Sequence, residues 1–255
     1  MPAGARRRLP FALFCAAALL APAAGLSQKP ADPPPGFRIT PVRPVAELRT
    51  DALAAQPPRE TGAFHPADLV ELARTVPGVK LEIRYATSNN FLETPVYEQA
   101  RAFLQRPAAE SLARVAKALR AQGFGLLVFD GYRPWYVTKI FWDATPEDKK
   151  QFVANPEEGS RHNRGCAVDL TLYDLKTGQA VNMPSGYDEM TGRAYADYAG
   201  GTDAERRHRE ALRGAMEAEG FTVYAYEWWH YDYRDWKAYR ISNLPFDRIA
   251  RAPSR

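Results

Sequence analysis

Cysteine and long apolar runs are both scarce in this chain of 255 residues. Cys15 and Cys166 are its only cysteines, and Cys15 lies in a segment that we expect to be removed, so no intramolecular disulfide can form. The apolar stretch Leu9–Leu20 is too short for a membrane-spanning helix, which needs ~20 residues, and no other segment approaches that length. We therefore expect a protein stabilised by its own core, without stable insertion in a membrane.

A strong excess of one charge is also missing. The formal net charge is +4, but three of the positive charges are Arg6, Arg7 and Arg8, and the rest of the chain keeps about +1. That is too little for a surface that follows a phosphate backbone, so we expect no nucleic-acid partner. Regular βαβ spacing, a glycine-rich phosphate turn and internal repeats are absent as well, which argues against doubly wound nucleotide-binding folds and solenoids.

The N-terminus has the pattern of an export signal. A basic cluster precedes the apolar stretch and small residues follow it, so residues 1–25 are predicted to be the signal peptide of a secreted, periplasmic protein. Lipid attachment at Cys15 is an alternative, although the bulky Phe14 before it does not suit such a site. Residues 26–60 are rich in Pro and Ala and predict an extended arm or linker, which leaves 61–255 for a single domain.

Helical and strand patterns alternate irregularly in this domain. Apolar stripes predict helices, and short apolar or aromatic runs predict strands. The predicted helices are 106–122 and 202–219, and the predicted strands are 124–129, 166–173 and 221–233. With an apolar fraction of 45% to fill a core, we expect one α+β domain with a mainly antiparallel sheet flanked by helices.

Two short runs far apart in the sequence carry the residues of a metal site, namely SRHNRGCAVD and EWWH. The first contains His162 and Asp169, and the second contains Glu227 and His230. A catalytic zinc ion uses three nitrogen or oxygen ligands and keeps its fourth position open. We predict that His162, Asp169 and His230 are these ligands, and that Glu227 takes the proton of a water.

The predicted strands set conditions on this site at the sheet. Alternate side chains of a strand face opposite sides, so Glu227 and His230 can share a site only if a bulge or a strand end lies close to His230. His162 and Asp169 can meet if His162 lies in a loop and only Asp169 is on the strand. Cys166 is expected to pack under that loop, because thiolate ligands are typical of closed structural zinc sites.

The pattern S-x-H-x-x-G-x-A-x-D followed by E-W-W-H resembles the zinc D-alanyl-D-alanine dipeptidases, the vancomycin-resistance type of D,D-dipeptidase. Further motifs agree with that family in order and approximate spacing from Phe64 to Phe246. They are Tyr85-Ala86-Thr87 with Asn90-Phe91, Asp130-Gly131-Tyr132-Arg133-Pro134, Asp169-Leu170-Thr171-Leu172 and Tyr187-Asp188-Glu189-Met190. Agreement of several separated motifs makes the resemblance specific.

The resemblance implies one zinc ion per chain and hydrolysis of a small dipeptide, D-alanyl-D-alanine, to two D-alanines. It also implies that Arg133 stabilises the tetrahedral intermediate, that Asp188 and Tyr85 hold the substrate's amino group, and that Ser160 holds its carboxylate. A guanidinium group after a strand end suits an oxyanion, whereas a surface salt bridge is the alternative role for Arg133. Asp130 is expected to be a structural turn residue.

Related functions would use some of the same residues. A D,D-carboxypeptidase would trim a longer peptide in an open groove, whereas charged groups that meet both ends of a dipeptide favour the dipeptidase. A non-catalytic zinc-containing binding module would not need Glu227, and the number of agreeing motifs disfavours a metal-free structural protein. His65 and His208 are expected to lie on the surface. The export signal favours turnover of wall-derived dipeptide over glycopeptide resistance.

Overall fold

The computed structural model describes Met1 and residues 37–249. The chain divides into two units, Met1–Pro34 and Pro35–Arg255, and the second contains every element described below. Apart from Met1, the predicted signal peptide lies outside the described residues. Among the helices that are described, none combines the length and apolarity needed to cross a bilayer.

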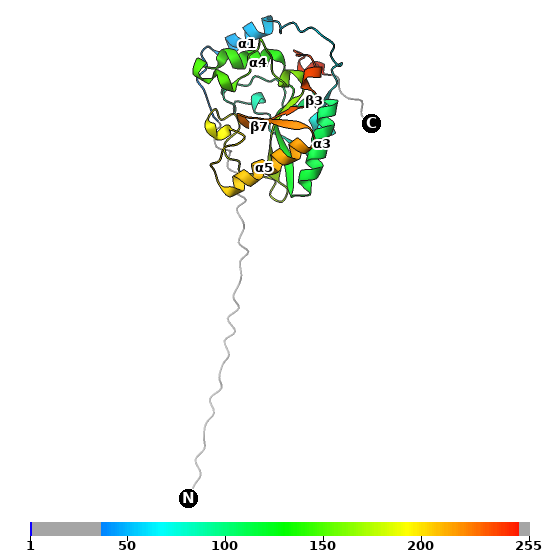
Figure 1. Ribbon diagram of the computed structural model, residues 1–255. Helices are drawn as coiled ribbons and strands as arrows, with labels where there is room; N and C mark the ends of the chain where they lie inside the picture. The colour runs from blue at the N-terminus through cyan, green and yellow to red at the C-terminus, as the bar shows by residue number, and fades with distance from the viewer. Residues whose placement is uncertain (2–36, 250–255) are drawn as a thin grey trace. The chain divides into compact units, whose positions relative to one another are not determined.

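A five-stranded sheet forms the centre of the second unit (Figure 1). Three of its four strand pairings are antiparallel and only β2 pairs parallel with β4, which confirms the predicted α+β domain with a mainly antiparallel sheet. In spatial order the strands are β2 (Lys80–Leu81), β4 (Phe124–Asp130), β5 (Ala167–Asp174), β7 (Glu227–Tyr233) and β6 (Phe221–Tyr224).

Helix α3 (Arg106–Arg120) packs beside β4 and corresponds to the first predicted helix. Pro107 stands in its first turn, where a missing backbone N–H has no helical partner to lose. Apolar residues three and four positions apart give it one buried stripe, as expected for a helix that covers a sheet. The stripe consists of Leu112, Val115, Ala116 and Leu119.

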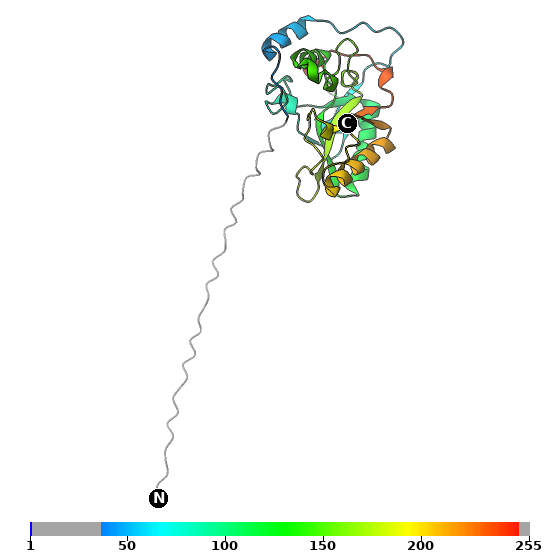
Figure 2. The same ribbon diagram turned by 60° about the vertical axis from the view of Figure 1, so that its left-hand side comes forward.

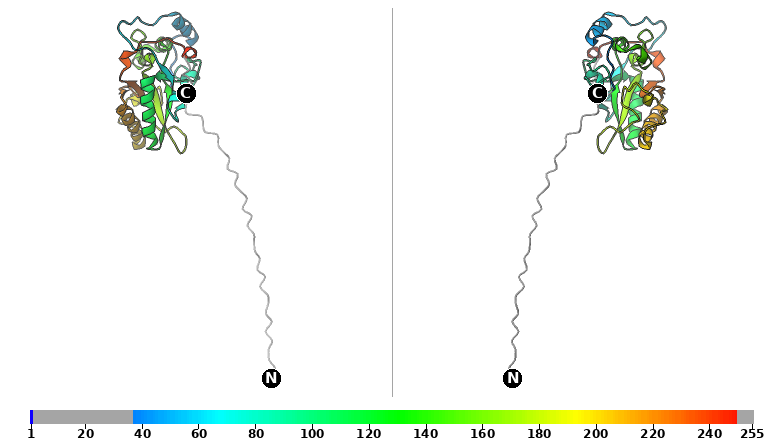
Figure 3. Two further views of the ribbon diagram at one scale, coloured as in Figure 1. Left: turned by 90° about the vertical axis from the view of Figure 1, so that its right-hand side faces the viewer. Right: turned by 90° about the vertical axis from the view of Figure 1, so that its left-hand side faces the viewer.

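Helix α5 (Asp203–Ala218) lies with α3 on one side of the sheet (Figure 3). It begins at a capping box, because the Thr202 hydroxyl accepts the Glu205 N–H at 3.2 Å and the Glu205 carboxylate accepts the Thr202 N–H at 2.7 Å. Leu212 and Met216, one turn apart, are fully buried. This helix matches the predicted one at 202–219.

Helix α1 (Val45–Ala54) corrects the prediction for the Pro- and Ala-rich region. It packs against α4 (Trp135–Ala144), as Figures 1 and 2 show. Leu48 and Ala52, one turn apart, are fully buried, so this stretch belongs to the core. The prediction of an extended arm or linker over 26–60 is therefore wrong for these residues, and the compact unit begins before residue 61.

The smaller elements lie around the central sheet. β1 (Leu69–Glu71) and β3 (Phe103–Gln105) form a separate antiparallel pair, and α2 (Leu72–Thr75) follows β1 directly. Short 3-10 helices lie between and after these elements. They are Arg84–Ala86, Glu147–Phe152, His162–Arg164, Gly192–Ala194, Trp236–Ala238 and Phe246–Arg248.

The aromatic segment 221–233 is a hairpin, and not the single strand that the sequence predicted. A tight turn joins β6 to β7. Where the pairing advances by one residue on β6, it advances by four on β7, from Tyr231 to Glu227. Trp228–His230 therefore bulge out of the pairing with β6, which confirms the irregularity predicted close to His230.

Candidate active site

Two bulges at one end of the sheet bring the predicted residues together. Near the end of β4 the register shifts after Val128, so that Asp130 pairs with Asp169 of β5. On its other side Asp169 pairs with His230 of β7. Asp169 thus lies between the DGYRP turn and the EWWH strand, at a position where bulges re-aim side chains, as they commonly do beside active sites.

His162 reaches the same point from a loop, as predicted. It begins the 3-10 turn His162–Arg164, and Gly165 ends that turn with a left-handed φ of 68°. A Cβ at Gly165 would also lie 2.5 Å from Cδ2 of Leu69. Only glycine satisfies both conditions without strain, and it directs the chain from the His162 loop into β5.

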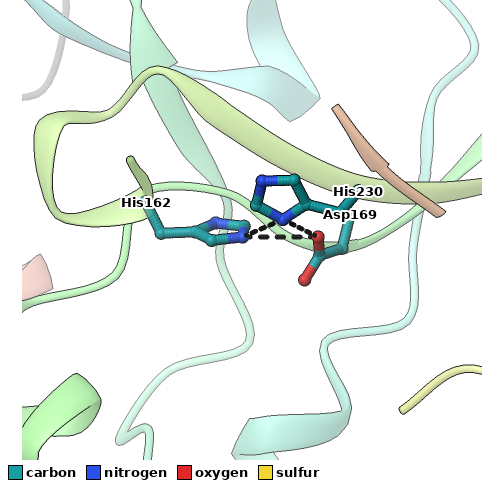
Figure 4. Close-up of side chains that lie close together, drawn as sticks. All are labelled: His162, Asp169 and His230. Carbon is teal, nitrogen blue, oxygen red and sulfur yellow. Dashed lines mark hydrogen bonds and ion pairs between the residues drawn. The ribbon is translucent and has the colours of Figure 1, made fainter. Parts of the chain in front are cut away.

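The three predicted ligands form a compact triangle (Figure 4). His162 Nε2 lies 3.1 Å from His230 Nδ1 and 3.3 Å from Asp169 Oδ1, and the last two atoms are 3.1 Å apart. Ligands of a tetrahedral zinc ion with bonds of ~2.0–2.1 Å are separated by about 3.3 Å. The triangle therefore has the size required for a small cation held by three protein atoms.

The outer ring nitrogen of each histidine is already bonded. His162 Nδ1 lies 2.7 Å from the Gly131 carbonyl oxygen, and His230 Nε2 lies 2.9 Å from Asp232 Oδ1. The carbonyl and the carboxylate can only accept hydrogen bonds, so a neutral imidazole donates to them and keeps its lone pair on the nitrogen that faces the triangle.

The triangle therefore brings together two nitrogen lone pairs and a carboxylate oxygen. These groups repel one another at this distance unless a cation neutralises them. The residues therefore fit a metal ion.

Neighbouring charges also make the triangle favourable for positive charge. Burial by itself would raise the pKa of Asp169, but His162 and His230 outweigh it and the pKa is lowered. Burial by itself would lower the pKa of His230, but Asp232 and Asp169 outweigh it and the pKa lies well above its ordinary value. A metal ion at this site would take the place of protons.

Glu227 stands beside the triangle and is not part of it. Its Oε2 lies 3.7 Å from His230 Nδ1, farther than any distance within the triangle. Burial raises the pKa of Glu227 to about 7, and the charge of His230 acts against that shift. A carboxyl group with such a pKa can both accept and return a proton near neutral pH.

Asp130 holds Arg133 in a fixed position. Arg133 Nε and Nη2 lie 2.9 and 2.8 Å from Asp130 Oδ2, while the Tyr97 hydroxyl donates to the other oxygen at 2.8 Å. The guanidinium carbon lies 5.4 Å from the ring centre of Tyr85 and 4.8 Å from that of Phe141. Arg133 is buried, which excludes the surface salt bridge, and Asp130 does more than form a turn.

Tyr85, Tyr187 and Asp188 form a hydrogen-bonded chain that ends in an unsatisfied oxygen. Tyr85 donates to Asp188 Oδ1 at 2.9 Å, and the Tyr187 hydroxyl oxygen lies 3.0 Å from both the Tyr85 hydroxyl and Asp169 Oδ2. Asp188 Oδ2 is buried without a hydrogen-bond partner among residues 37–249. Burial, with the charge of Asp169, raises the pKa of Asp188 well above its ordinary value. A cationic ligand group would satisfy this oxygen.

Every predicted site residue lines one cavity of about 230 Å³. Ser160 belongs to its wall, and the Ser160 hydroxyl accepts the His162 N–H at 3.2 Å, so its own proton can point elsewhere. The volume is below the ~300–1,000 Å³ typical of sites for drug-sized ligands, which favours a small ligand. His65 and His208 do not line the cavity, and Cys166 is fully buried as predicted.

Sequence reasoning missed two contributors and the role of a third. Asp232 follows His230 by two residues on a strand, so the alternation of side chains could have identified it. Tyr187 was noted in the YDEM motif without a role. Asp130 was expected to act only in a turn, because its contact with Arg133 depends on how the DGYRP segment folds back.

Known proteins resemble this chain over most of its length. Residues 65–247 match the family model described as D-ala-D-ala dipeptidase. The D-alanyl-D-alanine dipeptidase of Escherichia coli is 35% identical over 165 residues, which are 65% of this chain and 84% of that protein. The enzyme of the same name from Enterococcus faecium is 39% identical over 182 residues, 64% of this chain and 90% of that protein. A third dipeptidase of this name, from Streptomyces coelicolor, is 35% identical over 186 residues, which are 66% of this chain and 92% of that protein. This chain therefore belongs to the D-Ala-D-Ala dipeptidase family of metallopeptidases.

Proposed function

We propose that the protein is a zinc-dependent dipeptidase that hydrolyses D-alanyl-D-alanine to two D-alanines. The observation that carries this proposal is the triangle of His162, Asp169 and His230 with the spare carboxylate of Glu227 beside it. The relatives from Escherichia coli and Enterococcus faecium are D-alanyl-D-alanine dipeptidases, and the chain covers 84% and 90% of them.

His162, Asp169 and His230 would hold one zinc ion per chain. Neutral imidazoles and a carboxylate are common zinc ligands, and a set of three leaves the open position that catalytic sites have. Bound zinc supplies Lewis acidity to a water and to the scissile carbonyl group. Elemental analysis of the purified protein tests this assignment, with one zinc per chain as the expected result.

Glu227 serves as the general base and then as the general acid. It accepts a proton from the water as the water oxygen attacks the carbonyl carbon, and it returns a proton to the amine nitrogen as the C–N bond breaks. Its pKa of about 7, raised by burial, suits both transfers near neutral pH. A non-catalytic binding module would have no use for this group, so the presence of Glu227 beside the triangle favours the enzyme.

Arg133 donates hydrogen bonds to the oxyanion of the tetrahedral intermediate. Its guanidinium group lines the cavity, and Asp130 and two aromatic rings hold it there before substrate arrives. A donor that is already oriented costs little reorganisation when negative charge develops on the carbonyl oxygen. Two of its nitrogens contact Asp130, and the planar fork provides further donors for the substrate.

Charged and polar groups meet both ends of a dipeptide. Asp188, oriented by Tyr85, would bind the ammonium group, because its Oδ2 is buried and unsatisfied in the described part of the chain. Ser160 would donate its hydroxyl to the carboxylate. The cavity of about 230 Å³ suits a dipeptide with small side chains better than a long peptide.

A substrate panel separates the dipeptidase from a D,D-carboxypeptidase. We expect the purified protein to release D-alanine from D-Ala-D-Ala, and to act poorly on L-Ala-L-Ala and on a longer peptide ending in D-Ala-D-Ala. Faster hydrolysis of the longer peptide would favour the carboxypeptidase, because a blocked amino group could not pair with Asp188.

We also propose that the protein acts outside the cytoplasm, in the turnover of wall-derived dipeptide. The basic, apolar and small-residue pattern of residues 1–25 supports export. Cell fractionation should recover a shortened chain from the periplasm. Recovery of full-length protein from the cytoplasm would contradict the proposal.

A further inference from the structure

Asp232 contacts a predicted metal ligand from outside the triangle. It lies two residues after His230 on β7, in a part of the sheet where it pairs with Ala167 of β5 and Thr222 of β6. Its side chain is 16% exposed, and Oδ1 lies 2.9 Å from His230 Nε2. Figure 4 shows that this ring nitrogen points away from His162 and Asp169.

The second oxygen of Asp232 faces the loop that carries the other histidine ligand. Arg161, the residue before His162, has its Nε 3.5 Å from Asp232 Oδ2. The Arg161 guanidinium lies over the Trp236 ring at 4.8 Å, and its buried Nε has no hydrogen-bond partner among the described residues. Asp232 thus contacts both the strand of His230 and, outside the triangle, the loop of His162.

We infer that Asp232 is a positioning residue for the metal centre. The inference rests on the zinc site proposed above and adds a residue that does not line the cavity and acts only through His230. By accepting the Nε2 proton of His230, the Asp232 carboxylate fixes the tautomer, so that the Nδ1 lone pair faces Asp169 and His162. Its negative charge also makes the imidazole a stronger donor to a cation.

A purely structural role is the alternative. In that case Asp232 would only neutralise Arg161, and its loss would lower the stability of the metal-free protein without changing affinity for zinc. The two roles are separable because a side chain that orients a ligand changes metal affinity, typically by ~10–100-fold, even where the fold is intact.

The test compares Asp232→Asn with Asp235→Asn in the full chain. Asp235 makes the matched control, because it undergoes the same chemical change three residues further on, is 56% exposed and pairs only loosely with Arg234 at 3.8 Å. Zinc dissociation constants are measured by competition with a chelator, and the melting temperature of each metal-free protein is measured in parallel. We expect zinc binding about 10–100-fold weaker for Asp232→Asn and unchanged for Asp235→Asn. A wild-type zinc dissociation constant in folded Asp232→Asn would overturn the inference.

A measurement on the wild-type protein does not depend on whether the variant folds. Long-range 1H–15N correlation of the zinc-loaded protein reports which nitrogen of His230 carries the proton. We expect the proton on Nε2, and a proton on Nδ1 would overturn the inference. If the wild-type protein binds no zinc at all, the proposed metal centre fails and this inference fails with it, whereas equal zinc binding by wild type and Asp232→Asn defeats the inference alone.

Discussion

The two ends of strands β4 and β5 have opposite characters. In the first part of β4 the pairing is regular, and Leu126 lies opposite Leu172, with both side chains buried in the core. At the other end the register shifts, and Asp130 lies opposite Asp169. These two side chains are as deeply buried as the leucines, yet they carry charge and contact Arg133.

Burial has different consequences at the two ends. A buried leucine contributes about 1.5–3 kcal/mol to stability, whereas a buried charge costs free energy unless it is paired and hydrogen-bonded. The paired apolar residues in the regular part of β4 and β5, such as Leu126 and Leu172, form an apolar ladder. This ladder holds in place a cluster of charges that would not assemble by itself. From this comparison we expect changes at the polar end to affect catalysis, and changes in the ladder to affect stability.

Glu227→Ala is expected to have the largest effect at the polar end. Loss of the general base should lower kcat by about 10²–10⁴-fold, while zinc content stays at one per chain because Glu227 lies outside the triangle. His230→Ala is the matched variant and should lose zinc and activity together. Turnover and metal content are measured on the same preparations, and a near wild-type kcat in Glu227→Ala would place the base elsewhere.

Arg133→Ala should follow, with kcat lower by about 10²–10³-fold and a modest rise in KM. The melting temperature should also fall, because Asp130 would remain buried without its partner. Arg133→Lys keeps the charge and separates the two effects, since it should restore stability more than turnover. An unchanged kcat with a large rise in KM would make Arg133 a substrate anchor.

Asp188→Asn should act mainly on substrate binding. An ammonium ion bonded to a carboxylate is worth ~1.5–3 kcal/mol, so KM for D-Ala-D-Ala should rise about 10–100-fold with little change in kcat. N-acetyl-D-Ala-D-Ala, which lacks the charge, is the matched substrate. Acetylation of the substrate should raise the KM of the wild-type protein about as much as the Asp188→Asn substitution does, and it should raise the KM of the variant little further. Additive increases in KM would show that Asp188 does not contact the amino group.

Leu172→Ala, in the apolar ladder, should have the smallest effect on activity. The substitution leaves a cavity in the core and should lower the free energy of unfolding by ~2–5 kcal/mol. Zinc affinity and kcat should stay close to wild type at a temperature where the variant is folded. Denaturant unfolding and steady-state kinetics measure the two quantities. A loss of turnover comparable to that of Arg133→Ala would break the distinction between the two ends of the sheet.

Sequence patterns were informative where one local rule decides the structure. The stripe of α3 and the apolar runs of β4 and β5 identified these elements within one or two residues, because periodicity and burial agree there. The ligand triangle was predictable for another reason. Imidazoles and carboxylates that recur in specific motifs have few roles other than metal binding and proton transfer.

Other features depend on contacts that no local pattern records. Helix α1 lies in a Pro- and Ala-rich region, and only its packing against α4 explains why Leu48 and Ala52 are buried. The turn between β6 and β7 contains no glycine, proline or asparagine, so the sequence predicted one continuous strand instead of a hairpin. The contact between Asp130 and Arg133 is close in sequence, but it depends on how the DGYRP segment turns at the end of β4.

Stepwise return of zinc to metal-stripped protein tests the central claim most directly. The release of D-alanine from D-Ala-D-Ala is followed as zinc is added to a known concentration of chain. Because one ligand triangle is present in the described residues, activity should rise linearly and reach its plateau at one zinc per chain. Full activity in the stripped protein before any zinc is added, or no hydrolysis after one equivalent has bound, would contradict the account.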